Sequence, residues 1–153
     1  MQYIHYGSNS FDISSFKPIS NRQYNKPNGG LWASPIGTLH NEYHGWYNWC
    51  KENSYKVDRL NKSFTFNIDS EAKIFKIHKD EDLKKLKIYD RSYLLGFSSE
   101  DQDAFWNINF EQMIFDGYQA IEVLINTQKI YWDLYGWDCD SLLVFDPEIM
   151  IFK

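Results

Sequence analysis

The 153-residue sequence has the length of one domain and can bury a sizeable hydrophobic core. Its aromatic share is high at 18%, with six Trp, eleven Tyr and eleven Phe, so we expect a bulky core and rings whose polar edges can meet a ligand. A net charge of -5 does not favour nucleic acid as a stable partner, because proteins that bind it normally present a basic face to phosphate. The one basic cluster, Lys84, Lys85 and Lys87, follows Glu81 and Asp82 and is typical of a solvated helix face.

Membrane and export signals are missing from the sequence as given. Its apolar runs are far shorter than the ~20 residues of a membrane span, and Met1 to His5 contain no cationic region followed by an apolar stretch. We therefore expect a cytoplasmic protein with no membrane partner, in which Cys50 and Cys139 are reduced thiols. No repeat or linker divides the chain, so residues 1–153 are expected to form one domain.

The first part of the chain predicts two strands and a helix. Residues 2–6 alternate and are aromatic-rich, which indicates a strand, and the Pro-, Gly-, Ser- and Asn-rich residues 8–29 indicate a long loop. Residues 30–34 read as a short strand stopped by Pro35. Aromatic side chains at helical spacing predict an amphipathic helix over residues 41–52.

The second part mixes strands and helices. Residues 63–68 and 72–77 alternate with period two, and the gap between them suggests a hairpin. Asp80 is expected to cap a helix, and a second helix is expected from 103 to 115 with its C-cap at Gly117. The mixture lacks the regular alternation of a doubly wound sheet, which predicts an α+β fold. Three further strands are expected at 120–125, 129–132 and 141–145.

Three segments together carry a resemblance to a known family. They are Tyr3-Ile4-His5-Tyr6-Gly7-Ser8, then Gly30-Leu31-Trp32-Ala33-Ser34 with the aromatic helix after it, and finally residues 117–123 with 137–149, which include Val144-Phe145-Asp146-Pro147. Their order resembles the ADP-ribosyltransferase superfamily, in particular its diphtheria-toxin-like and poly-ADP-ribose-polymerase branch and small bacterial toxin relatives. That resemblance implies a split mixed or antiparallel β core with a few flanking helices, and NAD+ as co-substrate.

The opening strand would bind NAD+ if the resemblance holds. His5 would hydrogen-bond the adenosine-side ribose, and the backbone of Gly7 would hold the nicotinamide amide with Ser8 assisting. Tyr6 stands between His5 and Gly7, where the family has no residue, so this loop departs from the family pattern.

The second segment would supply the stacking aromatics. Trp32 matches the aromatic that shields one face of nicotinamide, and Ser34, which ends the motif, is counted among the NAD+-binding residues. Tyr43 matches the second stacking aromatic, with Trp46 as the alternative. Cleavage of the nicotinamide–ribose bond builds positive charge on the ribose, so a pocket that pins nicotinamide beside a carboxylate favours that transition state.

The carboxylate is the main departure from the family. The alignment of the closing strand places Ser141 where the catalytic Glu is expected. Asp138, Asp140 and Glu122 are the candidates that could replace it. The arginine-specific branch does not match, because its Arg and Glu-x-Glu have no counterparts at the required places.

Two functions follow from the resemblance. The first is transfer of ADP-ribose from NAD+ to a macromolecular target, most simply a protein, or hydrolysis of NAD+; toxin, phage-defence and counter-defence roles suit a small member. The alternative is a catalytically degenerate module of the same fold that acts through a protein partner. A third reading, unrelated to the family, is an interaction protein whose aromatic excess forms an interface.

Plainer interpretations accompany each of these residues. His5 could be a satisfied histidine at a strand end, Trp32 and Tyr43 core aromatics, and Asp138 and Asp140 turn residues before a strand. His40 and His44 share a helix spacing that suggests zinc, but Asn41 replaces the Glu of the metalloprotease motif and no third ligand is evident. Neither a Gly-x-Ser-x-Gly elbow nor a phosphate-binding glycine loop is present.

Overall fold

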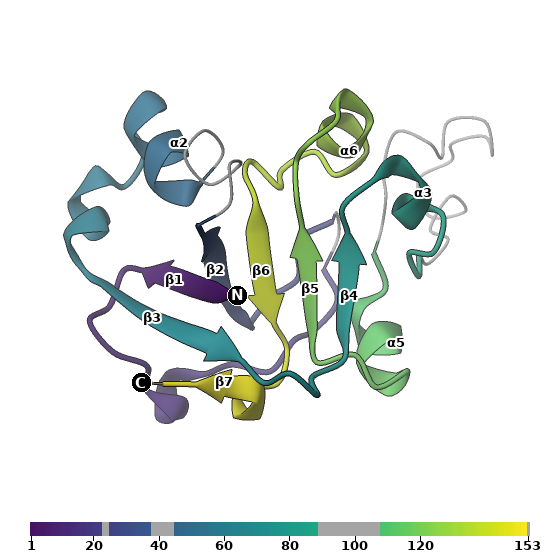
Figure 1. Ribbon diagram of the computed structural model, residues 1–153, viewed down its shortest axis with the longest axis horizontal. Coiled ribbons are helices and arrows are strands. Elements are labelled where there is room, and N and C mark those ends of the chain that lie inside the picture. The colour runs from purple at the N-terminus through teal and green to yellow at the C-terminus, as the bar shows by residue number, and fades with distance from the viewer. Residues whose placement is uncertain (23–24, 38–44, 89–107, 153) are drawn as a thin grey trace.

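The computed structural model describes residues 1–22, 25–37, 45–88 and 108–152 (Figure 1). Its fold is α+β, as predicted, with a mixed seven-stranded sheet in the order β4-β5-β6-β2-β1-β3-β7. The strands are β1 (Gln2–Tyr6), β2 (Leu31–Ile36), β3 (Ser63–Ile68), β4 (Ile74–Ile77), β5 (Ala120–Val123), β6 (Ser141–Val144) and β7 (Met150–Ile151). The helices of the described part are α2 (Trp46–Glu52), α3 (Asp80–Leu83), α5 (Phe110–Phe115) and α6 (Gln128–Asp133), with 3-10 turns η1 (Ile13–Ser15), η2 (Val57–Asn61) and η4 (Pro147–Ile149).

Strand β2 changes partner half-way along its length. Its first half, Leu31 to Ala33, pairs with β6, and its second half, Ser34 to Ile36, pairs with β1. The sheet therefore consists of two half-sheets joined by β2: a first half-sheet of β1, β3 and β7, and a second half-sheet of β4, β5 and β6. In Figure 1 the strands of the first half-sheet cross the direction of β4, β5 and β6. β1 and β6 diverge where β2 passes from one to the other.

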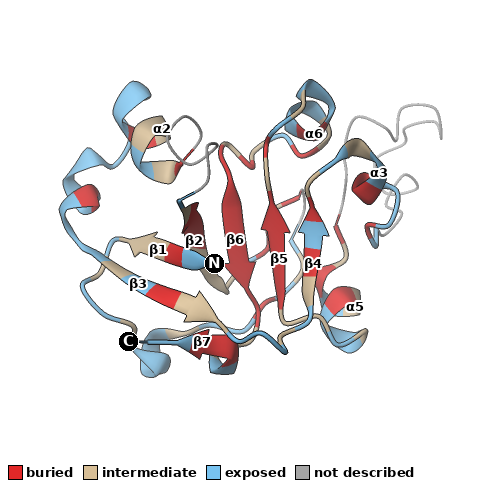
Figure 2. Ribbon diagram, viewed as in Figure 1, coloured by how far each residue is buried: buried red, intermediate tan, exposed pale blue. Residues whose placement is uncertain are grey.

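Two hydrophobic cores stabilise this arrangement. The outer core packs α3, α5 and α6 against one face of the second half-sheet, through residues such as Leu83, Phe110 and Ile130. The inner core lies between the half-sheets and contains Tyr3 and Phe66 from the first and Leu142 and Val144 from the second, among others. β5 and β6 contribute side chains to both cores, and Figure 2 shows them buried along their whole length.

At the start of β2 the backbone of Gly30 lies very close to β6. Gly30 has a φ of +70°, and a Cβ there would lie 2.6 Å from Cδ1 of Leu143 and 2.9 Å from the carbonyl oxygen of Val144. The glycine pair expected to mark a loop therefore has a packing role: only a residue without a side chain lets β2 start directly against β6.

Pro35 does not stop β2, contrary to the sequence prediction. The strand continues to Ile36, and Pro35 lies opposite Tyr3 of β1. Pro is tolerated because the second half of β2 has no β6 partner, so no ladder on that side requires the missing N–H.

The predicted hairpin between 63–68 and 72–77 is also wrong, although both strands exist. β3 pairs with β1 and β7, whereas β4 pairs in parallel with β5 at the other edge of the sheet. The connection is a turn in which Asp69 accepts from the backbone N–H of Glu71 (2.9 Å) and its own N–H donates to the carbonyl of Ile149 (2.9 Å). It carries the chain between the half-sheets.

The segment predicted as a strand at 129–132 is helix α6. The Thr127 side chain caps it by accepting from the N–H of Ile130 at 3.1 Å. Ile130 and Leu134 are buried while Tyr131 and Trp132 are exposed, which is helical rather than strand spacing.

The other helix predictions are partly tested. Asp80 is the first residue of α3 and not its N-cap, which is Lys79. α5 ends as expected before Gly117, whose φ is +85°. Residues 41–44 and 103–107 of the two predicted helices lie outside the described residues. Among the residues described, none of the helices has the length and apolar character that a membrane crossing requires.

Candidate functional site

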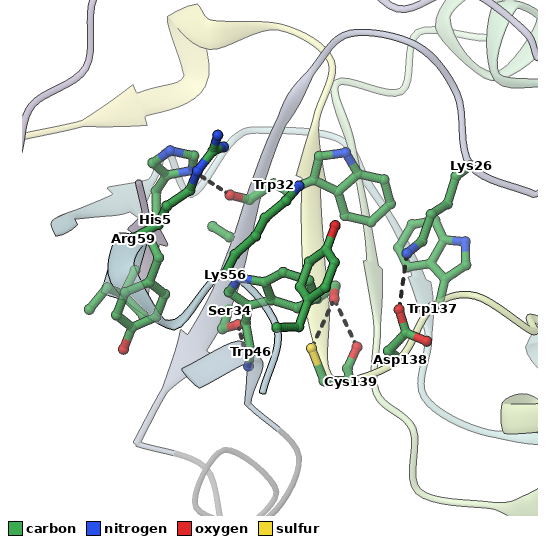
Figure 3. Close-up of a pocket in the computed structure, with 15 residues that line it drawn as sticks. His5, Lys26, Trp32, Ser34, Trp46, Lys56, Arg59, Trp137, Asp138 and Cys139 are labelled. Carbon is green, nitrogen blue, oxygen red and sulfur yellow. Dashed lines mark hydrogen bonds and ion pairs between the residues drawn. The ribbon is translucent and has the colours of Figure 1, made fainter. Parts of the chain in front are cut away.

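A pocket of about 290 Å³ opens where β1 and β6 diverge along β2. Its walls come from β1 (Ile4 to Tyr6), β2 (Trp32 to Ser34), the start of α2, the segment around η2, and residues 137–141 before and in β6. Figure 3 shows His5 and Arg59 at one end of this pocket and Lys26, Trp137 and Asp138 at the other. Segments from across the sequence therefore meet in one cavity.

His5 connects β1 to β2 at the pocket wall. Its Nδ1 lies 2.7 Å from the backbone oxygen of Trp32 (Figure 3). A carbonyl can only accept, so Nδ1 carries the proton and Nε2 of the neutral ring is left as an acceptor. Burial lowers the pKa of His5 below its ordinary value, and the hydrogen bond to Trp32 opposes this only in part. The ring is thus a neutral acceptor suited to a hydroxyl group such as that of a ribose.

Trp32 has both a structural and a ligand-facing side. Its ring packs on Trp137 with centroids 4.7 Å apart and an interplanar angle of 59°, and Nζ of Lys26 lies 5.6 Å from its centroid. Trp32 nevertheless remains partly exposed and lines the pocket. Trp32 is thus a core aromatic where it contacts Trp137, and its remaining surface is available to a planar ligand.

Ser34 positions the aromatic helix. Its Oγ accepts a hydrogen bond from the backbone N–H of Trp46 at 3.2 Å and so supplies the cap that Gly45 lacks. Trp46 lines the pocket and stacks on Trp49 at 5.1 Å. Ser34 thus lines the pocket as predicted, while its hydroxyl is engaged in holding α2.

Gly7 and Ser8, which were also predicted to bind NAD+, are not part of the pocket lining. Gly7 lies beside it, with a φ of +116°, and its N–H donates to the carbonyl of Lys62 at 2.8 Å, which leaves only its carbonyl free for a ligand. Ser8 donates to the carbonyl of Ser10 at 3.1 Å. Tyr43 lies outside the described residues, and Trp46, the alternative, lines the pocket.

The three candidate carboxylates have different surroundings. Asp138 lines the pocket, and its side chain is 30% exposed and forms an ion pair with Lys26 (Nζ–Oδ2 3.2 Å). Asp140 is fully buried outside the lining, and its Oδ1 accepts from the N–H of Ile125 at 2.7 Å. Asp138 is therefore the only one of the three that a pocket ligand can reach.

Glu122 belongs to the interior. Its buried carboxylate accepts a hydrogen bond from the hydroxyl of Tyr3 and lies 2.7 Å from Nε2 of His78. Burial and this hydrogen bond raise the pKa of Tyr3. Because Tyr3 is in β1 and Glu122 in β5, the pair links the two half-sheets through the inner core.

The comparisons with known proteins give no relative. No family model matches the chain, and neither a curated protein nor a solved structure matches it significantly. Any function must therefore be argued from the site itself.

Ser141, at the position expected for a catalytic Glu, does line the pocket. Its Oγ donates to the carbonyl of Cys139 at 2.8 Å. Cys139 also lines the pocket, but burial raises its pKa to about 12, so the thiol stays protonated and is a poor nucleophile.

Sequence reasoning missed the cations of the pocket. Lys26, Lys56 and Arg59 all line it. None belongs to a motif, and they come from two loops and a 3-10 turn, so no local spacing could reveal them. An indirect signal existed: residues 51–62 hold four of the chain's basic side chains in a sequence of net charge -5.

A metal site receives no support from the described residues. No group of three His, Cys, Asp or Glu side chains gathers there to hold an ion. His40 and His44, the pair with zinc-like spacing, lie outside the residues that the structure describes.

Proposed function

We propose that the protein binds NAD+ in this pocket and acts as an ADP-ribosyltransferase-like enzyme that transfers ADP-ribose to a macromolecular target or hydrolyses NAD+. The observation that carries the proposal is that residues from separate segments of the sequence meet in one cavity. His5, Trp32, Ser34 and Asp138, selected by their positions in three separate segments, line one cavity. The position assigned to the family's Glu, now Ser141, lines the same cavity.

The proposed chemistry gives three of these groups a task. Trp32 would cover one face of nicotinamide, and neutral His5 would accept a hydrogen bond from a ribose hydroxyl through Nε2. As the bond between ribose C1 and the ring nitrogen breaks, its electron pair passes to nicotinamide, which leaves neutral. Asp138 would stabilise the positive charge that grows on the ribose. An acceptor oxygen or nitrogen, or water, then bonds to C1 and releases a proton to solvent.

The size of the pocket limits how the ligand can sit. Its volume of about 290 Å³ is at the lower end of small-molecule sites. It is too small to enclose the whole dinucleotide, so part of NAD+ would extend out of the pocket.

A second candidate function is a degenerate NAD-binding module that acts through a protein partner. Two observations favour it: Ser141 replaces the expected Glu, and Lys26 already neutralises Asp138 at 3.2 Å. A carboxylate held by a lysine stabilises a second positive charge less well than a free one.

Binding and turnover separate these functions. Tryptophan fluorescence is followed as NAD+ is added to the wild-type protein and to His5→Ala, because Trp32, Trp46 and Trp137 all line the pocket. Saturable quenching that weakens at least tenfold in His5→Ala supports the pocket, and no response at millimolar NAD+ refutes both functions.

Nicotinamide release from labelled NAD+ then decides between an enzyme and a binding module. Release that falls about 100-fold or more in Asp138→Asn, with NAD+ affinity kept, supports the enzyme. Asp140→Asn is the neighbouring control, because its carboxylate lies outside the pocket lining. Binding without any release, alone or with cell lysate, supports the module.

A further inference from the structure

Positive charges outnumber negative charges in the pocket lining. Among the described residues of the lining, Lys26, Lys56 and Arg59 are cationic and Asp138 is the one acidic residue, while the pKa of His5 is lowered toward the neutral ring. Lys26 and Asp138 form an ion pair, which leaves two positive charges in a chain whose net charge is -5. Within the described ranges no carboxylate pairs with Lys56 or Arg59. An excess of two cations matches an anion of two charges.

The backbone holds one of these two cations, Lys56, in an unusual conformation. Lys56 has a φ of 45° and Ser54 a φ of 52°, the two non-glycine residues with positive φ in the described part of the chain. Such a conformation is strained for a residue with a side chain. It lets the neighbours Tyr55 and Lys56 both line the pocket, with Nζ of Lys56 only 4.8 Å from the Tyr55 ring centroid.

The cations lie toward the His5 end of the pocket. η2, which carries Arg59, is tied to β1 where the N–H of Gly7 donates to the carbonyl of Lys62 at 2.8 Å. Figure 3 shows Arg59 at the end of the pocket that His5 occupies, with Lys56 between that end and the indole of Trp32. A ligand that spans from Trp32 to His5 would therefore carry its anionic middle past Lys56 and Arg59.

We infer that Lys56 and Arg59 form a diphosphate-binding subsite and that the pocket selects dinucleotides and nucleoside diphosphate sugars over phosphate-free nucleosides. This inference rests on the proposed function for the order of the ligand along the pocket. The guanidinium fork of Arg59 suits two phosphate oxygens, and the ammonium of Lys56 acts as a point charge.

Calorimetric titration with three probes tests the subsite. NAD+ and ADP-ribose contain the diphosphate, whereas nicotinamide riboside lacks it. Lys56→Gln and Arg59→Gln are each expected to weaken NAD+ and ADP-ribose roughly tenfold and to leave nicotinamide riboside within about twofold. Added salt should weaken the two diphosphate ligands in the wild-type protein, and less so in these variants.

Lys51→Gln is the matched control. Lys51 is exposed, lies over the Tyr47 ring at 4.7 Å as Lys56 lies over Tyr55, and is not in the pocket lining. It should leave all three affinities within about twofold. An effect as large as that of Lys56→Gln would overturn the subsite, because a general surface charge would then explain the binding.

The probes also separate failure of the subsite from failure of the proposed function. If ADP-ribose binds through Lys56 and Arg59 but NAD+ is never cleaved and nicotinamide riboside does not bind, the subsite stands and the enzyme does not. If NAD+ binds and is cleaved with no loss in either variant, the enzyme stands and the subsite is wrong. No binding of any probe refutes both.

Discussion

Replacing Glu122 with leucine should destabilise the fold rather than remove a catalytic group. The Tyr3 residue is only 3% exposed, and its hydroxyl would lose the carboxylate that accepts its hydrogen bond. A buried hydroxyl without a partner costs about 1–3 kcal/mol. The His78 side chain is 35% exposed and can turn to water, so it adds little. We expect a loss of about 2 kcal/mol in the free energy of unfolding, or roughly 4–8 °C in Tm for a chain of this size.

A double-mutant cycle locates that cost. Tyr3→Phe alone should lose about 1.5 kcal/mol, because it leaves the carboxylate of Glu122 with one partner fewer. In the double variant Tyr3→Phe/Glu122→Leu the hydroxyl and the carboxylate are both gone. Its loss in the free energy of unfolding should therefore be about 1–2 kcal/mol smaller than the sum of the losses in the two single variants. Urea unfolding followed by tryptophan fluorescence measures all four proteins.

The same variants test whether Glu122 takes part in chemistry. Folded Glu122→Leu protein should bind NAD+ as the wild type does, because Glu122 is not part of the pocket lining. Purely additive single changes would show that Tyr3 and Glu122 do not interact. Unchanged stability together with lost NAD+ turnover would show that Glu122, and not Asp138, is the working carboxylate.

Three further predictions concern the pocket and its frame. Gly30→Ala should lose about 2–4 kcal/mol of stability, because its φ of +70° is strained for alanine and the new Cβ meets Leu143 and Val144; an unchanged urea midpoint would contradict this. The pKa of His5 is lowered in the folded protein, so its ring stays neutral at pH 6.5. NAD+ affinity measured by calorimetry should therefore stay level down to pH 6.5 and fall only below it. Because the unfolded chain takes up the proton first as the pH falls, the contribution of His5 to stability is complete above pH 6.5 and is lost as the pH falls toward the folded pKa. Ser141→Glu in an Asp138→Asn background should raise nicotinamide release at least tenfold by restoring a carboxylate, and no gain despite NAD+ binding would show that position 141 does not face the ribose.

The sequence predicted the elements whose side-chain pattern is local. β1, β3 and β4 follow from alternation, and the end of α5 follows from Gly117. The sequence-based prediction failed for features that depend on strand partners distant in the sequence. A turn at residues 69–71 looks the same whether it joins paired strands or carries the chain between half-sheets, and Pro35 is acceptable only because β6 has already left β2.

Three residues singled out in the sequence, His5, Trp32 and Ser34, lie in one cavity because β2 pairs with β1 where it leaves β6. The carboxylates could not be ranked, since Asp138 and Asp140 are both turn residues before β6 and only packing buries one and exposes the other. The place of Lys56 depends on a left-handed backbone conformation that no residue preference indicates, and Arg59 follows it in η2.

The partner change in β2 also determines when the pocket can exist during synthesis. β1 and β6 belong to distant parts of the sequence, yet both must be paired with β2 before the cavity has its walls. A nascent chain that has emerged only as far as β5 has no closing wall and no Asp138 in place. If the protein consumes NAD+, the ribosome-bound chain would be inert until β6 has emerged and paired with β2.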